Sequence, residues 1–261
     1  MHESDSHTQR DAVEVVNRNG TSPVLLLCEH ASSSIPARYD GLGLREADRL
    51  SHAAWDPGAR SVAHHMCRAL DAPLVASTVS RLVYDCNRPP EAASAMPEKS
   101  ELVEVPGNKD LTVDQRLERV ETVYEPFCTT VSDVIKTRME AGLQTVLVTM
   151  HSFTPVYFGK QRAVEIGILH DDDSRLADAM LAQAPALPHR RVERNEPYGP
   201  ADGVTHSLKI HGLAHGLANV MIEIRNDLVA TPEEEEAMAE EMLTLLRPAL
   251  AALAAEGGPD A

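Results

Sequence analysis

The sequence predicts an α/β fold in three layers, with a mostly parallel, mixed sheet and helices on both of its faces. Two observations predict this class. Five short runs are mostly apolar, as is typical of strands that are buried on both faces. Segments with helical periodicity separate these runs, and such an alternation indicates α/β. The chain of 261 residues is long enough for one compact domain with a substantial core.

The predicted strands are the five apolar runs, at residues 24–28, 73–79, 145–150, 164–169 and 219–224. Helices are predicted between them. Apolar residues recur at the helical period over residues 51–70 and again over 117–135, where Pro126 is expected to kink or break the helix. Residues 174–184 are predicted to form a further helix. The last helix has the clearest start, with Thr231 as its cap, Pro232 at the first helical position and acidic residues in the first turn.

The domain organisation is predicted to be simple. Residues 1–20 are predicted to form a polar N-terminal segment, residues 21–255 a single domain, and residues 256–261 a flexible tail of small residues. Residues 91–109 and 185–203 are long, polar and contain proline. We expect them to be loops that cover a site.

The composition narrows the function classes. The 24 Lys and Arg residues against 40 Asp and Glu residues give a net charge of −16, which argues against nucleic acid and anionic membranes as partners. No segment is apolar enough to span a membrane and no signal peptide is visible. The four cysteines show neither metal-binding nor disulfide spacing, so a cytoplasmic protein with reduced thiols is expected. The sequence leaves open whether the chain forms a homo-oligomer.

Candidate catalytic residues follow the predicted strands, because ligands of parallel sheets gather at the carboxyl ends of the strands. His30 follows the first strand, His151 the third, and Glu223 lies near the end of the last. Asp56 lies near the start of the first long helix. Two imidazoles and a carboxylate are a ligand set for Zn²⁺, and a further carboxylate can act as a base toward water. The pattern therefore predicts metal-assisted hydrolysis.

Each of these residues also has a structural alternative. A histidine after a strand is more often a core or loop residue, and an aspartate beside Pro-Gly is more often a turn or cap residue. Glu223 could form an ion pair with Arg225 instead of acting as a base. Glu29 competes with His30 as a ligand, although neighbouring strand residues point to opposite faces. We prefer His30, with Glu29 orienting a ligand or the loop.

Arginines form a second group of candidates. Arg81 and Arg88 follow the second strand, and with Arg225 they could hold the carboxylates of a substrate. The alternative is that Arg81 and Arg88 pair with local acids such as Asp56 or Asp85. Aromatic residues gather in or beside the same segments, which favours a walled pocket.

Five ordered motifs resemble the N-formylglutamate amidohydrolase family, with matching spacing from about Val24 to Val229. They are Leu27-Cys28-Glu29-His30-Ala31-Ser32, Trp55-Asp56-Pro57-Gly58-Ala59, the segment from Ser80 to Arg88, Met150-His151-Ser152-Phe153, and Ile222-Glu223-Ile224-Arg225-Asn226-Asp227. The resemblance implies a zinc-exopeptidase-like (phosphorylase/hydrolase-like) fold. It also implies hydrolysis of N-formyl-L-glutamate to formate and L-glutamate, the last step of one histidine degradation route.

The ligand pattern is similar to that of zinc N-acetylmuramoyl-amidases. It implies one Zn²⁺ on His30, Asp56 and His151, with Glu223 as the catalytic base. The HxxE motif of carboxypeptidases does not carry over, because Ser33 stands where its glutamate would be. Which of Glu29 and Asp56 is the carboxylate ligand is therefore the least settled assignment.

The expected partner is a small anionic N-acyl amino acid. Four polar residues are expected to hold the substrate and two aromatic residues to wall the pocket: Arg81, Asn87, Arg88 and Arg225, and Tyr84 and Phe153. Two rival functions remain. One is hydrolysis of another N-acyl amino acid or of a cell-wall amide. The other is a non-catalytic sensor of N-acyl amino acids.

Overall fold

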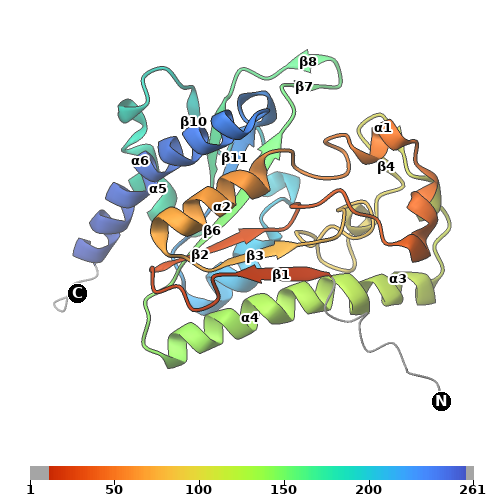
Figure 1. The fold of residues 1–261 in the computed structure, drawn as a ribbon, viewed down its shortest axis with the longest axis horizontal. Helices are drawn as coiled ribbons and strands as arrows, with labels where there is room; N and C mark the ends of the chain where they lie inside the picture. Colours follow the sequence, from red (N-terminus) through yellow and green to blue (C-terminus); the bar gives the residue numbers. More distant parts are fainter. Residues whose placement is uncertain (1–11, 257–261) are drawn as a thin grey trace.

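The computed structural model describes residues 12–256, which form a seven-stranded mixed sheet covered by helices on both faces (Figure 1). The strand order is β1-β3-β2-β6-β11-β9-β10. Four central strands run parallel to one another, namely β3 (Leu74–Ser77), β2 (Val24–Cys28), β6 (Val146–Phe153) and β11 (Asn219–Arg225). β9 (Ile166–Leu169) is antiparallel to β11, and β10 (Val192–Arg194) is parallel to β9. The predicted fold class is confirmed.

Two strands of this sheet were not predicted. β1 (Val13–Val16) lies in the segment that was expected to be a polar extension, and pairs antiparallel with β3 at one edge. β10 lies in a predicted loop and forms the other edge. Both strands are only half-buried, so they lack the continuous apolar run that identified the central strands. Residues 1–11 and 257–261, which include most of the predicted tail, lie outside the described residues.

Helices pack on both faces of the sheet (Figure 1). α2 (Ala59–Leu70), α5 (Arg175–Leu181) and α6 (Pro232–Glu256) share one core with the sheet. α4 (Glu125–Glu140) covers the other face, and α3 (Val113–Arg119) precedes it in the chain. Pro126 does not end its helix. Instead a π-helical turn at Val120–Tyr124 joins α3 to α4 directly before it, which accommodates the missing N–H of the proline.

The start of α2 differs from the prediction. The helix begins at Ala59, not near residue 51, because Pro57-Gly58 breaks the backbone there and Gly58 adopts a φ of 79°. A Cβ at position 58 would lie 2.4 Å from Cγ2 of Val229, so the turn also needs glycine for close packing. Asp56 therefore lies in an irregular turn before the helix, and its backbone N–H donates to the carbonyl of His30 at 3.0 Å.

The predicted start of α6 is confirmed. The hydroxyl of Thr231 accepts a hydrogen bond from the N–H of Glu234 at 3.3 Å, and the Glu234 carboxylate accepts one from the N–H of Thr231 at 3.0 Å. This reciprocal pair is a capping box, which satisfies two backbone donors at the helix start.

The remaining elements are short. Two small hairpins, β4 (Lys99–Ser100) with β5 (Val103–Glu104) and β7 (Val156–Tyr157) with β8 (Lys160–Gln161), stand outside the main sheet. Isolated helical turns are α1 (Glu46–Arg49), a π-helical turn at Leu208–Gly212, and 3₁₀ segments at Ala37–Gly43, Ala93–Ala95, Pro106–Asn108, Ala184–Ala186, Pro200–Asp202, Leu213–His215 and Asn226–Leu228. All four cysteines are free. Within residues 12–256, no helix combines the length and the apolar character needed to cross a membrane.

Candidate metal centre and pocket

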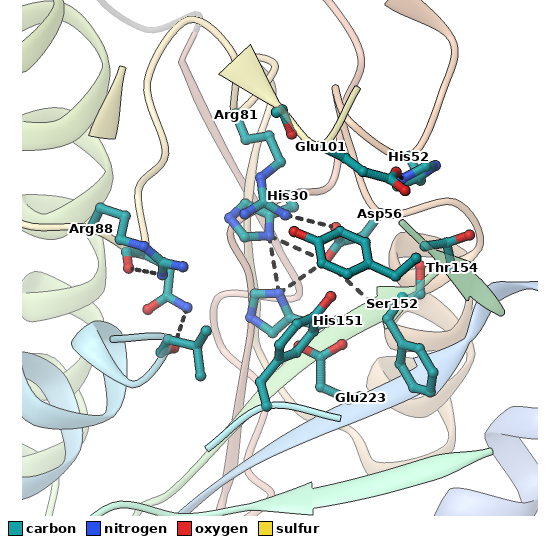
Figure 2. Close-up of a pocket in the computed structure, with 16 residues that line it drawn as sticks. His30, His52, Asp56, Arg81, Arg88, Glu101, His151, Ser152, Thr154 and Glu223 are labelled. Carbon is teal, nitrogen blue, oxygen red and sulfur yellow. Dashed lines mark hydrogen bonds and ion pairs between the residues drawn. The ribbon is translucent and has the colours of Figure 1, made fainter. Parts of the chain in front are cut away.

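Three predicted ligands converge at the carboxyl ends of the parallel strands (Figure 2). His30 follows β2, His151 lies near the end of β6, and Asp56 lies in the turn before α2. His30 Nδ1 and His151 Nδ1 lie 3.2 and 3.0 Å from Asp56 Oδ2, and 3.1 Å from each other. All three side chains are buried. A tetrahedral zinc ion with bonds of about 2.0–2.1 Å separates its ligand atoms by about 3.3 Å, so this triangle could hold such an ion with little movement.

A buried carboxylate lies behind each imidazole. His30 Nε2 is 2.7 Å from Asp85 Oδ1, and His151 Nε2 is 3.2 Å from Glu29 Oε2. Because a carboxylate only accepts hydrogen bonds, it favours the proton on the Nε2 that faces it. Both Nδ1 lone pairs then point at the Asp56 oxygen. Two lone pairs and an anionic oxygen repel one another unless a cation lies between them, so the chemistry of this donor set fits a metal ion.

The charges of this cluster also fit a divalent ion. Burial disfavours the charged form of each carboxylate, but the neighbouring histidines outweigh it and lower the pKa of Glu29, Asp56 and Asp85. The Arg81 guanidinium lies 3.3 Å from Asp56 and 2.9 Å from Asp85. With both imidazoles neutral, as metal ligands are, three ionised carboxylates against one guanidinium leave two buried negative charges. A divalent cation would neutralise them, whereas leaving them uncompensated is costly.

Without a metal ion, His151 can supply part of that positive charge. Burial alone would lower the pKa of His151, but the charges of Glu29 and Asp56 raise it well above its ordinary value. The structure thus places Glu29 behind His151 and Asp56 in the ligand set. The sequence had left the choice between Glu29 and Asp56 open, and the group that could hold a metal ion contains Asp56.

Glu223 lies in β11, paired in register with His151 of β6. It lines the same pocket, and its Oε2 is buried without a hydrogen-bond partner among residues 12–256. Burial raises its pKa to about 7, and the Asp56 carboxylate adds to the shift. Glu223 makes no ion pair with Arg225. The Arg225 side chain instead pairs with Asp227 at 2.7 Å and with Glu165 at 3.5 Å, and it does not line the pocket.

The pocket above these residues is small, with a volume of ≈ 160 Å³. It lies below the roughly 300–1,000 Å³ of pockets for drug-sized ligands. Predicted residues Arg81, Asn87, Arg88 and Phe153 line it. Ser100 and Glu101 come from the predicted loop 91–109, and Tyr198 comes from the predicted loop 185–203, so both segments do cover the site. His52, Thr154 and Tyr157 complete the upper walls.

The two remaining arginines differ in their partners. Arg81 is bound to Asp56 and Asp85, as the structural alternative had it. Arg88 donates to the carbonyl of Asn87 at 2.8 Å and has no carboxylate within ion-pair distance in the described part of the chain. Arg88 is therefore the pocket arginine whose positive charge can bind an anion.

Asn87 and Tyr84 have supporting positions. The Asn87 amide donates to the carbonyl of Val204 at 2.6 Å and accepts from the N–H of Ser207 at 2.9 Å, which ties the segment 204–207 to the site. Tyr84 was expected to wall the pocket, but it is 1% exposed, lies outside the lining and donates to the carbonyl of Arg88 at 3.3 Å.

Several site residues were not predicted as such. Asp85 appeared only as a partner for arginines, although it lies two residues before Asn87 in the same motif. No sequence pattern identified His52 and Glu101 as site residues, because they reach the pocket only through tertiary contacts between loops. His211 is buried, and burial lowers its pKa to about 4, but it is not part of the ligand group.

Comparisons with known proteins bear on the family and on the fold. The family model for N-formylglutamate amidohydrolase matches residues 22–230. The crystal structure of a gene product from Agrobacterium tumefaciens is 54% identical, with a TM-score of 0.91 over 93% of this chain and 96% of that chain. The crystal structure of an N-formylglutamate amidohydrolase from Ralstonia eutropha JMP134 is 17% identical, with a TM-score of 0.71 over 95% of this chain and 100% of that chain. At that identity the second likeness concerns the fold alone. A search of curated proteins gave no match.

Proposed function

The chain belongs to the N-formylglutamate amidohydrolase family, and we propose that it is a zinc-dependent amidohydrolase that cleaves N-formyl-L-glutamate into formate and L-glutamate. One observation carries the proposal. The buried ligand triangle of His30, Asp56 and His151 shares a small pocket with the unpaired carboxylate of Glu223 and the uncommitted guanidinium of Arg88. A metal site, a base and an anion-binding group are the parts that hydrolysis of an anionic amide requires.

The metal would be held by two imidazole nitrogens and one carboxylate oxygen, a set that zinc accepts with a position left open. When bound, zinc supplies Lewis acidity, which polarises an amide carbonyl and acidifies water. The protein supplies the rest. Asp85 and Glu29 hold the two imidazoles in the required tautomer, and Arg81 fixes the second oxygen of Asp56.

Glu223 has the position and the pKa of a general base. With a pKa of about 7, it can both accept and release a proton near neutral pH. It takes a proton from the attacking water and delivers it to the amide nitrogen. The C–N bond then breaks, and the oxygen of water stays on the formyl carbon. The products are formate and the free amino group of glutamate.

Arg88 would hold a substrate carboxylate by a charge-assisted hydrogen bond, in a pocket that Phe153 also lines. The small volume of the pocket favours an amino-acid substrate over a cell-wall amide, whose extended chain needs an open groove. We place the protein in the cytoplasm, at the last step of a histidine degradation route.

The test is formate release from N-formyl-L-glutamate by purified protein, first with added Zn²⁺ and then with a chelator. The proposal expects release that depends on zinc and stops on chelation. If zinc-loaded, folded protein releases no formate, the substrate assignment is wrong. Thermal stabilisation by the substrate without any product would favour a sensor.

A further inference from the structure

Two hairpin tips meet at the mouth of the pocket. Glu101 begins the two-residue turn between β4 and β5, and Phe158 begins the turn between β7 and β8. Both have left-handed backbone conformations, with φ of 51° for Glu101 and 45° for Phe158. Residues other than glycine rarely adopt this conformation, and such residues gather where the surrounding structure has a use for them.

Contacts of the Glu101 carboxylate hold the tips together. Its Oε1 accepts a hydrogen bond from the backbone N–H of Phe158 at 2.8 Å, and its Oε2 lies 2.8 Å from Nε2 of His52. The Glu101 side chain is only 12% exposed although it lies in a hairpin turn. We call His52, Glu101 and Phe158 the clasp. It joins three segments that are far apart in the sequence.

The clasp lies on one side of the metal ligands and Arg88 on another. Figure 2 shows His52 and Glu101 beside Thr154, with the cluster of His30, Asp56 and His151 between them and Arg88. A substrate whose carboxylate is bound by Arg88 and whose amide carbon lies at the ligands must direct its acyl group away from Arg88. The clasp is the wall that this acyl group would meet.

We propose that Glu101 determines the length of acyl group that the enzyme accepts, an inference that rests on the proposed function. The clasp limits the space beyond the amide, so that a formyl group fits and a longer chain must displace the hairpin tips. The same wall is polar, because the Glu101 carboxylate and the Thr154 hydroxyl lie on it. Burying an alkyl chain against a carboxylate leaves that carboxylate poorly solvated, which adds to the selection against longer chains.

The experiment compares kcat/KM for N-formyl-, N-acetyl- and N-butyryl-L-glutamate in four proteins. Glu101→Gly removes the clasp and suits a left-handed turn, so this variant should fold. Glu101→Gln keeps both contacts possible and is the conservative variant. Glu104→Ala is the matched control, because Glu104 lies in the same hairpin and pairs with Lys99 and Lys109 at 3.1 and 3.4 Å, outside the pocket lining.

A pocket discriminates one methylene by roughly 10–200-fold. We therefore expect wild type and Glu104→Ala to favour formyl over butyryl by at least about 100-fold, and Glu101→Gly to lower that ratio by about tenfold or more. The ratio of kcat/KM for the formyl substrate to that for the butyryl substrate should stay within about threefold of wild type in Glu101→Gln. An unchanged ratio in Glu101→Gly, with an active wild type, would overturn the role of Glu101 and leave the proposed function intact. A wild type that cleaves none of the three substrates would overturn the proposed function and this inference with it.

Discussion

The carboxylates behind the two histidines should control metal affinity, and Glu29→Gln tests this with the least change in shape. Glutamine keeps an oxygen that can accept from His151 Nε2, now 3.2 Å from Glu29 Oε2, but it removes the charge. A hydrogen bond across this ion-pair contact would be worth about 1.5–3 kcal/mol with a charged acceptor and about 0.5–1.5 kcal/mol with a neutral one. The loss of about 1–1.5 kcal/mol corresponds to a roughly tenfold weaker zinc affinity. That value lies at the lower end of the roughly 10–100-fold effects of residues that orient metal ligands.

The assay is the dissociation constant of Zn²⁺, measured by competition with a chromogenic chelator in wild type and variants. Asp85→Asn makes the same change behind His30, where the contact is shorter at 2.7 Å, so its effect should be at least as large. Glu165→Gln is the control, because Glu165 pairs with Arg190 and Arg225 away from the pocket. Its zinc affinity should equal that of wild type.

Two results would refute this reasoning in different ways. If Glu29→Gln binds zinc as tightly as wild type while Asp85→Asn binds it more weakly, Glu29 does not act on the metal through His151. If both variants keep the wild-type affinity, neither carboxylate acts on the metal through its histidine.

Three further variants test other parts of the site and of the fold. Glu223→Gln should keep its zinc, measured as metal content, and lose about 10²–10⁴-fold in kcat because the proton carrier is gone; near-normal turnover would exclude Glu223 as the base. Arg88→Ala should raise KM roughly 10–100-fold by removing a charged contact, whereas Arg225→Ala should leave KM unchanged because Arg225 lies outside the pocket. Gly58→Ala should lower the free energy of unfolding by about 2–4 kcal/mol, because a Cβ would meet Val229 at 2.4 Å in a left-handed turn. The expected decrease in Tm is roughly 5–15 °C. An unchanged Tm would show that the turn adjusts to the Cβ without strain.

The sequence was sufficient to predict those parts of the fold and of the site that depend on local hydrophobic pattern and on strand direction. Continuous apolar runs identified the central strands, and the rule that ligands gather at the carboxyl ends of strands then brought His30, His151 and Glu223 together. The turn that carries Asp56 was mistaken for helix, yet the residue was still found, because its place in the chain mattered more than its conformation. Edge strands such as β1 were not predicted, because a half-buried strand does not require a continuous apolar run.

The prediction of side-chain roles was weakest for residues that can pair with several different partners. Nothing in the sequence distinguished Arg81, Arg88 and Arg225 from one another. In the structure Arg81 pairs with carboxylates of the site, and Arg225 pairs with carboxylates outside the pocket. Arg88 lines the pocket without a carboxylate partner among the described residues. Glu101 was one more acid in a polar loop. Only the contact between two hairpin tips distinguishes it, and that contact joins residues 57 positions apart in the chain.

The site is thus built from two kinds of structure with different freedom to change. Its floor belongs to β2, β6 and β11, adjacent strands of one sheet whose residues are almost wholly buried. A substitution there disturbs the core as well as the chemistry. The acyl-side roof depends on short hairpins held by a few contacts, such as those of Glu101, and the hairpin tips tolerate replacement more readily. Under the proposed function, the floor would carry the hydrolysis and the hairpins would limit the acyl group. The selectivity of the Glu101 variants therefore tests the roof separately from the chemistry of the metal ligands, because Glu101 lies outside the ligand set.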